Sequence, residues 1–294
     1  MTAKLTETNQ SVADRLSEFM KLKPVAMLGA GVSADCFPKS WDELIQILSQ
    51  KMGIQPKSTT NLNRAQELKD ADETKYTEAL REIFTKKPEE LPATLLKLTQ
   101  LPFKHYVTHN FDRSISEARG HNTGVAPQEQ FYPKIALADC TDGSVTYAHG
   151  AFKPDGEIED IDFIVLHTKA YIKAYKNNGS YSCFAYDFFR FVFKNEHILF
   201  VGIGLNDEAM QTLLEESSRS NSQKIILFPK GRYTGEHKVI KDLHKRAYNI
   251  EVLFYDAVDS DHSGLTSILE VVHNRIVLEP KIAQNTLQEG GIWE

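Results

Sequence analysis

The stretch Val25-Ala26-Met27-Leu28-Gly29-Ala30-Gly31-Val32-Ser33 decides how this chain folds. Four apolar residues in a row, followed at once by Gly-x-Gly, are typical of a buried strand that enters a phosphate-binding turn. Gly29 and Gly31 would let the backbone approach a pyrophosphate with its N–H groups, while Ser33 would add a hydroxyl donor. Taken alone, the motif is also compatible with a tight turn that binds nothing.

The residues after this turn argue against an ordinary dehydrogenase. Ala34 stands where the third glycine of a Gly-x-Gly-x-x-Gly motif is expected. No acidic residue occupies the ribose-binding position that would follow a second strand. The turn therefore predicts a nucleotide site of a different family.

Three later segments also follow strand candidates. They are Thr108-His109-Asn110-Phe111-Asp112, His149-Gly150 and Gly202-Ile203-Gly204-Leu205-Asn206-Asp207. In a parallel sheet, ligands bind beyond the carboxyl ends of the strands, so the four segments should meet at one edge. Together they predict a site for a dinucleotide with an acid/base group beside it.

Three polar residues of these segments are candidate catalytic groups. The Asn110 amide can hold a ribose hydroxyl or orient a water, and the Asp112 carboxylate can orient a neighbouring group. His149, with a pKa near neutrality, can take a proton from a ribose hydroxyl or a water. The alternatives are that Asn110 and Asp112 only cap the next helix, and that His149 is a hydrogen-bonded core or surface residue.

The last segment is a candidate adenosine site. Gly202 and Gly204 would permit close approach of a ribose, and Asn206 or Asp207 can bind its hydroxyls. The alternative is that Asn206 or Asp207 is an ordinary helix N-cap.

Short apolar runs alternate with amphipathic segments along the chain, which indicates an α/β fold. We expect a Rossmann-like parallel sheet with helices on both faces. The expected strands cover residues 24–28, 104–108, 144–148, 161–166, 198–201, 225–228 and 252–255. The expected helices cover residues 11–22, 41–52, 62–71, 74–87, 89–99, 113–118, 183–195, 207–216, 237–247 and 264–276.

The ends of two helices can be placed more closely. Ser11 can cap the helix expected at residues 11–22. Ser40 and Glu43 form a capping box at the start of the helix expected at residues 41–52, and Gly53 can end that second helix. Residues 120–144 are rich in turn formers and are expected to be irregular.

The domain organisation is expected to be simple. Residues 1–294 would form a single domain that binds a dinucleotide, with a small helical insertion at about 54–100. Residues 277–294 lack a packing pattern and are expected to form a C-terminal tail or a partner-binding arm.

The composition excludes several classes of protein. No apolar stretch approaches the roughly 20 residues that span a bilayer, and the polar start lacks a secretory signal, so no membrane contact and a cytoplasmic location are expected. The formal charge of −6 disfavours direct nucleic-acid binding by the chain as a whole. The widely spaced Cys36, Cys140 and Cys183 contain no Cys-x-x-Cys pair, so neither zinc nor another metal is expected.

The segment 183–195 is unusually aromatic. Phe184, Phe188 and Phe191 share one helix face, and Tyr186, Phe189 and Phe193 share another. Two apolar faces indicate either a buried core helix or a subunit interface.

The four segments resemble the sirtuin fold, and more narrowly the sirtuin-like NAD hydrolases of bacterial antiphage defence. In that family a glycine-alanine-glycine-x-serine turn is followed by a tryptophan near the next helix, where this chain has Trp41. The family also has a threonine-threonine-asparagine-tyrosine-aspartate segment, from which His109 and Phe111 depart. The resemblance covers roughly residues 22–275.

Two features separate the chain from sirtuin deacylases. It lacks the four cysteines of their zinc module, and Pro38-Lys39-Ser40-Trp41 stands where they have a proline-x-phenylalanine-arginine segment. The resemblance therefore implies hydrolysis of the nicotinamide–ribose bond of NAD, giving nicotinamide and ADP-ribose, and not deacylation of lysine.

The resemblance also implies a set of site residues and partners. NAD would be the substrate, with no further cofactor. Catalysis would involve Asn110, His149 as general base and Asp112, and binding would involve Gly29, Ala30, Gly31, Ser33, Trp41, Gly202, Gly204, Asn206 and Asp207. The implied biology is antiphage defence by NAD depletion, with activation through a homo-oligomer or through a partner such as a HerA-type ATPase.

Two other functions stay open at this point. The same fold could bind NAD or ADP-ribose as a non-catalytic sensor whose output is assembly, or the chain could be a structural subunit of a defence complex. A pure binder needs neither Asn110 nor His149, which favours the enzyme.

Overall fold

A parallel β-sheet forms the centre of the molecule. The computed structural model describes residues 5–153, 155–158, 160–176, 184–232, 236–257 and 263–280. Within these residues seven strands pair in the order β3-β4-β2-β1-β5-β6-β7, and every neighbouring pair is parallel. The strands are β1 (Val25–Leu28), β2 (His105–Thr108), β3 (Glu129–Phe131), β4 (Ser144–Tyr147), β5 (Ile198–Val201), β6 (Lys224–Pro229) and β7 (Ile250–Tyr255).

The apolar strands form because both faces of the sheet are covered. In β1, Ala26 and Leu28 pack into one core cluster, whereas Val25 and Met27 pack into the other. This alternation follows from the period of two in a β-strand. The four-residue apolar runs of the sequence are therefore strands that are buried on both sides.

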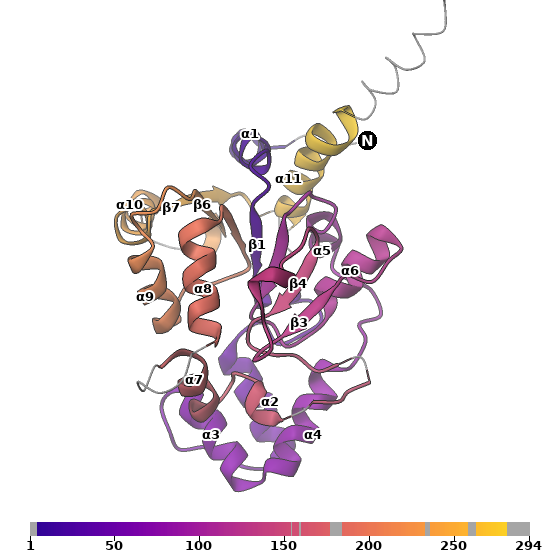
Figure 1. Ribbon diagram of the computed structural model, residues 1–294, viewed down its shortest axis with the longest axis vertical. Coiled ribbons are helices and arrows are strands. Elements are labelled where there is room, and N and C mark those ends of the chain that lie inside the picture. Colours follow the sequence, from indigo (N-terminus) through magenta and orange to yellow (C-terminus); the bar gives the residue numbers. More distant parts are fainter. Residues whose placement is uncertain are drawn as a thin grey trace, which may run out of the picture.

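Helices cover the sheet from both sides (Figure 1). One core cluster lies between the strands and the helices α1 (Glu7–Met20), α5 (Ala93–Leu98), α6 (Ser114–Thr123) and α11 (Ser263–His273). The other lies between the strands and the helices α7 (Thr168–Tyr175), α8 (Phe184–Asn195), α9 (Glu208–Glu216) and α10 (His237–Tyr248). The expected Rossmann-like α/β fold is confirmed.

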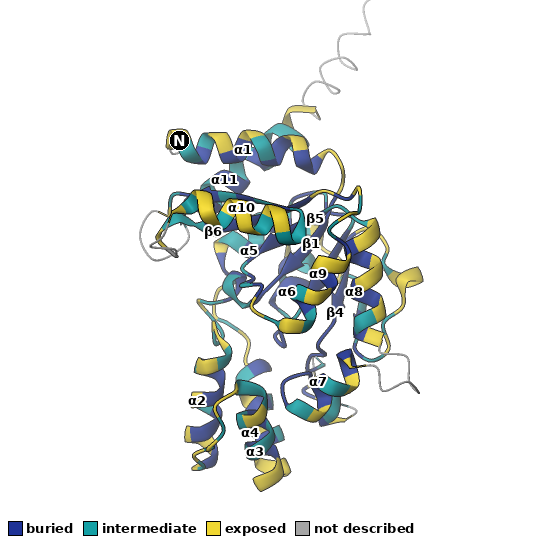
Figure 2. Cartoon of the chain, turned by 90° about the vertical axis from the view of Figure 1, so that its left-hand side faces the viewer, coloured by how far each residue is buried: buried dark blue, intermediate teal, exposed yellow. Residues whose placement is uncertain are grey.

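A group of helices beyond one end of the sheet forms what we call the helical lobe (Figure 2). It consists of α2 (Trp41–Met52), α3 (Asn61–Ala71) and α4 (Glu73–Phe84), which share a third core cluster with residues that follow β2 and β4. The segment expected as a helical insertion also contains α5, but α5 packs against α6 and α11.

Local capping explains where two helices begin. Before α2, the Ser40 hydroxyl accepts a hydrogen bond from the Glu43 N–H, and Gly53 ends the helix with a φ of 69°. The Glu43 carboxylate accepts from the Lys39 N–H. In contrast, α1 begins earlier than expected, because Thr6 and not Ser11 caps it by accepting from the Asn9 N–H.

Two secondary-structure predictions were wrong, and one helix was missed. Residues 161–166 are not a strand: Asp160 caps the 3-10 turn η3 (Ile161–Phe163), and the apolar residues after it pack into the core of the helical lobe. Residues 120–144 contain the edge strand β3, which lacks an apolar run. Helix α7 was not anticipated, and its N-cap is a histidine, His167.

The aromatic helix α8 is mainly a core helix. Phe188, Phe189 and Phe193 are buried in the second core cluster. Phe184 and Phe191 are exposed, with 51% and 42% of their surface accessible. The packing thus explains four of the six aromatic residues, including the partly buried Tyr186, and leaves two on the surface.

Other expectations concern the ends and the surface of the chain. The chain continues from α11 through the π-helical turn η5 (Asn274–Leu278), whereas residues 281–294 of the expected tail lie outside the described residues, as does Cys183. None of the described helices has the length and apolar character needed to cross a membrane.

Candidate functional site

The site lies at the point of the sheet where the strand order reverses. From β1 the chain builds outward to β2 and β4 on one side and then returns to place β5 on the other side. The loops that follow β1 and β5 therefore start side by side at the carboxyl edge, which is where α/β sheets bind ligands. Gly31 donates a 3.1 Å hydrogen bond to the Gly202 carbonyl, and Gly29 donates a 3.0 Å bond to the Val201 carbonyl.

Glycines are required here because the two loops touch through their backbones. A Cβ on Gly29 would lie 2.6 Å from the Gly202 carbonyl oxygen, and a Cβ on Gly31 would lie 2.8 Å from the Gly202 Cα. Gly202 has a φ of 69°, and its own Cβ would lie 2.7 Å from the Val32 nitrogen. The N–H groups of Gly29 and Gly31 thus bind the protein itself, which corrects the expectation that they face a phosphate.

A cleft of about 950 Å³ lies along this edge of the sheet and extends to the helical lobe. All four sequence motifs contribute to its wall, which confirms that the topology brings them together. The expected site residues in the wall are Gly29, Ala30, Gly31, Trp41, Asn110, Asp112, His149, Gly202, Gly204, Asn206 and Asp207.

Ser33 does not line the cleft. Its hydroxyl is buried, donates a 3.0 Å hydrogen bond to the Asp112 carboxylate and accepts a 3.2 Å bond from the Asn110 amide. Ser33 therefore positions two site residues, which corrects the expectation that it contacts a ligand directly.

The Asn110 side chain is held from several directions. Its amide nitrogen donates to Ser33 and, at 3.2 Å, to the Gly29 carbonyl, so both of its hydrogens are used. Its backbone N–H donates to Thr108, whose hydroxyl donates in turn to the Leu28 carbonyl. The amide oxygen of Asn110 is the atom left to accept a hydrogen bond from a molecule in the cleft.

Asp112 serves the local structure and also lines the cleft. One carboxylate oxygen accepts the Ser114 N–H at 3.0 Å at the start of α6, and the other accepts the Ser33 hydroxyl. Burial raises the pKa of this carboxyl, and these hydrogen bonds partly offset the rise.

His149 lines the cleft but is almost fully buried, which keeps its imidazole neutral. Its Nε2 lies 2.6 Å from the Tyr175 hydroxyl oxygen. Burial, and secondly the neighbouring His109, lower its pKa well below 6.5. This corrects the expectation of a pKa near neutrality, because within the described residues the imidazole contacts Tyr175 and His109 and no carboxylate offsets its burial.

Three residues of the site escaped the sequence analysis. The ring of His109 stacks on that of His149 with centroids 4.3 Å apart, and its buried Nε2 has no hydrogen-bond partner in the described part of the chain. Tyr171 and Tyr175 come from α7 and reach the cleft residues Asp207 and His149. The available signal was the spacing of the two tyrosines, because residues four apart lie on the same face of a helix.

Asp207 is mainly a helix cap. Its carboxylate accepts the Met210 N–H at 2.9 Å, as the N-cap of α9, and also accepts the Tyr171 hydroxyl at 3.0 Å. Burial raises its pKa. Asn206 is exposed in the cleft wall, so of this pair it is the residue available to a ligand.

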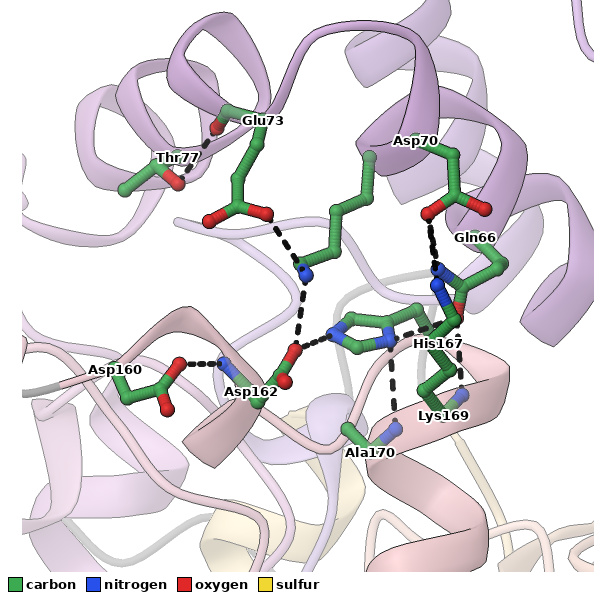
Figure 3. A network of polar contacts seen from close by, with 10 residues as sticks. Gln66, Asp70, Glu73, Thr77, Asp160, Asp162, His167, Lys169 and Ala170 are labelled. Carbon is green, nitrogen blue, oxygen red and sulfur yellow. Dashed lines mark hydrogen bonds and ion pairs between the residues drawn. The ribbon is translucent and has the colours of Figure 1, made fainter.

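Helix α7 is fixed to the helical lobe by a polar network (Figure 3). The buried Lys69 of α3 lies 3.0 Å from both Glu73 and Asp162, and Asp162 lies 3.2 Å from His167 at the start of α7. Gln66 of α3 accepts the Lys169 N–H. One helix thus connects the lobe to the cleft.

The described residues contain no group of three or more His, Cys, Asp or Glu side chains that could hold a metal ion.

Comparisons with known proteins identify the family. A family model described as a SIR2-like domain matches residues 104–253, which is half of the chain. A solved structure from work on the mechanism and regulation of Sir2 enzymes shares 12% identity, covers 91% of this chain and 98% of that chain, and gives a TM-score of 0.48. The comparison with curated proteins finds no match.

Proposed function

The chain belongs to the SIR2-like domain family, and from that premise we propose that it hydrolyses the nicotinamide–ribose bond of NAD to nicotinamide and ADP-ribose. The observation that carries this proposal is the cleft itself. It joins two tightly packed glycine loops at the switch point of the sheet with the polar side chains of Asn110 and His149. Clefts of this size at this position suit a dinucleotide.

The arrangement suggests an orientation for NAD. The pyrophosphate would lie against Ala30 and the start of the turn that follows it, and the adenosine ribose would lie near Gly204 and Asn206. The nicotinamide ribose would then lie near Asn110 and His149. This order follows the strand order β4-β2-β1-β5, because His149, Asn110, Ala30 and Asn206 lie in the loops after these strands.

The chemistry requires little of the protein beyond positioning. Nicotinamide leaves as a neutral molecule from a cationic ring, so the bond breaks with positive charge developing on the ribose. A pocket that excludes water from the nicotinamide end and holds the ribose hydroxyls favours this oxocarbenium-like state. The Asn110 amide oxygen is suited to accept a ribose hydroxyl or the attacking water.

Product analysis tests the proposal. Purified protein is incubated with NAD, and nicotinamide and ADP-ribose are quantified by chromatography and mass spectrometry. We expect equal amounts of both products from the wild type, and a loss of about 100-fold or more in Asn110→Ala and His149→Ala. His121→Ala, which changes an exposed histidine outside the cleft, is the control and should keep wild-type turnover.

We further propose that activity depends on assembly, and that NAD depletion serves antiphage defence in the cytoplasm. A homo-oligomer, or a HerA-type ATPase partner, would switch the enzyme on. The proposal draws on the family resemblance, and the exposed Phe184 and Phe191 offer an apolar surface for contact. Turnover should therefore be measured with the chain alone and after co-expression with the ATPase, together with the mass of each assembly.

A second candidate is a sensor that binds NAD or ADP-ribose without cleaving it. The enclosed, uncharged His149 favours this reading, because its Nε2 is already bonded to Tyr175. Measurable NAD binding with no products, in the presence of the partner, would establish the sensor and exclude the hydrolase.

A further inference from the structure

The contact between Tyr175 and His149 joins two separate elements of the fold. Tyr175 is the last residue of α7, and His149 follows β4. The two side chains are 4% and 3% exposed, respectively, and the hydroxyl oxygen lies 2.6 Å from Nε2. The rings meet edge-on, with an interplanar angle of 82°. Such a short contact between two neutral groups is a hydrogen bond in which one group must donate.

The phenol is the donor of this bond. Burial raises the pKa of Tyr175 well above 10, so the hydroxyl keeps its one hydrogen. Two acceptors are within reach: Nε2 of His149 at 2.6 Å and the Met210 sulfur at 4.0 Å. A thioether sulfur is a weak acceptor, whereas the unprotonated nitrogen of an imidazole is a strong one. The hydrogen therefore lies between Tyr175 and Nε2, and the proton of the neutral imidazole resides on Nδ1.

The surroundings of His149 keep it neutral. His109 stacks on one face of the imidazole, and Phe189 lies 5.0 Å from His109 and 6.3 Å from Tyr175, as measured between ring centroids. A second proton on His149 would place a charge beside another imidazole and within an apolar layer of rings.

Helix α7 holds Tyr175 in place. One turn earlier, the Tyr171 hydroxyl donates to Asp207 and accepts the Ala209 N–H. At its start, α7 is bonded to Gln66 of the helical lobe. Helix α7 is thus held at its first turn and at its middle by hydrogen bonds that do not involve His149.

We infer that Tyr175 is a positioning residue: it occupies Nε2 of His149, so that His149, which lines the cleft, offers Nδ1–H to a ligand as a hydrogen-bond donor and does not act as a general base. The catalytic meaning of this inference rests on the proposed function. With Nε2 engaged, Nδ1–H is the group left to bind an oxygen of the substrate, such as a ribose hydroxyl or the carboxamide carbonyl. Water, oriented by Asn110, would then add to the oxocarbenium carbon as nicotinamide departs and would release its proton to the solvent.

The tautomer of His149 can be measured without any turnover. Nitrogen-15 NMR of histidine-labelled protein separates protonated from unprotonated ring nitrogens, and the signals missing from His149→Asn identify residue 149. We expect Nδ1 protonated and Nε2 unprotonated in the wild type, with a mixture of tautomers in Tyr175→Phe. Tyr171→Phe is the matched control, because it lies on the same helix and bonds Asp207 instead. Protonated Nε2 in the wild type, or an unchanged spectrum in Tyr175→Phe, would overturn the inference.

Kinetics of three variants give the second readout. The amide nitrogen of His149→Asn lies near the place of Nδ1 and can donate, whereas that of His149→Gln lies near the place of Nε2. We expect NAD turnover to fall about tenfold in His149→Asn and about 1000-fold in His149→Gln and His149→Ala. A folded His149→Asn as inactive as the alanine variant would contradict the donor role. If the wild type itself does not cleave NAD, the hydrolase fails, and the NMR result still decides the tautomer.

Discussion

The two sides of the cleft are built in different ways. On the sheet side, backbone loops pack directly through glycines. Within the sheet that carries these loops, buried polar groups pair without charge: His105, at the start of β2, bonds the hydroxyls of Ser144 at 2.7 Å and Thr146 at 2.8 Å. On the lobe side, a buried lysine and carboxylates make the connection through Lys69 and Asp162. Close packing permits a single arrangement of the loops on the sheet side. The lobe side is held by ion pairs, which a change of pH or a substitution can remove.

This difference concerns the site because α7 belongs to both sides. Its first turn is bonded to the helical lobe, and its last residue is bonded to His149. Changes on the lobe side should therefore reach the cleft through one helix, while changes on the sheet side should alter the cleft directly.

The largest combined effect on stability and nucleotide binding is expected where the two glycine loops touch. Gly202→Ala adds a Cβ 2.7 Å from the Val32 nitrogen at a residue with a φ of 69°. We expect it to lower the free energy of unfolding by about 3 kcal/mol and to abolish nucleotide binding. Urea unfolding measures the first effect and calorimetric titration with NAD the second. Gly231→Ala is the control: it also lies in the cleft wall, but its Cβ would meet no atom within 4 Å, so both properties should be kept.

A smaller and more local effect is expected from the lobe side. Lys69→Met leaves Asp162 and Glu73 without their shared cation, and we expect a loss of about 2 kcal/mol because both carboxylates keep some solvent contact. Amide hydrogen exchange should speed up in α3 and α7 while the sheet stays protected. Equal exchange in the two regions would show that the lobe does not open separately.

An exposed ion pair provides the comparison for that variant. Lys75 lies 4.0 Å from Asp72, with 63% of its side chain accessible. Lys75→Met should change the stability by less than about 0.5 kcal/mol and leave the exchange pattern as it is.

The neutral polar groups of the sheet side predict how stability depends on pH. Burial lowers the pKa of His105 to about 4 from an unfolded value of 6.5, so the unfolded chain binds more protons between these values. This contribution is complete above pH 6.5 and is lost as the pH falls toward 4. As the pH falls from 6.5 to 5, the lowered pKa of His105 should reduce the free energy of unfolding by about 2 kcal/mol. Urea unfolding at several pH values should give a flatter profile for His105→Gln, and an equal slope in both proteins would contradict the assignment.

The smallest effect is expected on the outer face of α8. Phe191 is exposed, so Phe191→Ser should change the free energy of unfolding by less than about 0.5 kcal/mol. Phe193→Ala, two residues further along in the core, should cost about 3–5 kcal/mol. If Phe191→Ser instead lowers the mass of a native oligomer in light scattering, the exposed face of α8 is a subunit interface.

The sequence predicted the sheet side well because its signals are local. Four apolar residues before Gly-x-Gly are enough to place β1 and the loop after it, and the position of the other motifs after strands placed them at the same edge. In the helical lobe, Ser40 and Gly53 likewise marked the limits of α2, because capping involves only neighbouring residues.

The lobe side was predicted less well because its signals are not local. The apolar residues of the segment 161–166 were taken for a strand, and they are buried only because the helical lobe folds over them. The partners of Lys69 and Tyr175 come from elements that lie far apart in the sequence. The role of Ser33 was misjudged for the same reason, since its partner Asp112 is 79 residues away.

A crystal structure of Asn110→Ala with NAD tests the proposed binding mode most directly, because the substitution is expected to preserve the substrate. We expect an intact dinucleotide in the cleft, with its pyrophosphate at the loop that follows β1 and its nicotinamide ribose within hydrogen-bonding distance of His149. NAD bound with its adenosine end at His149, or bound outside this cleft, would contradict this binding mode.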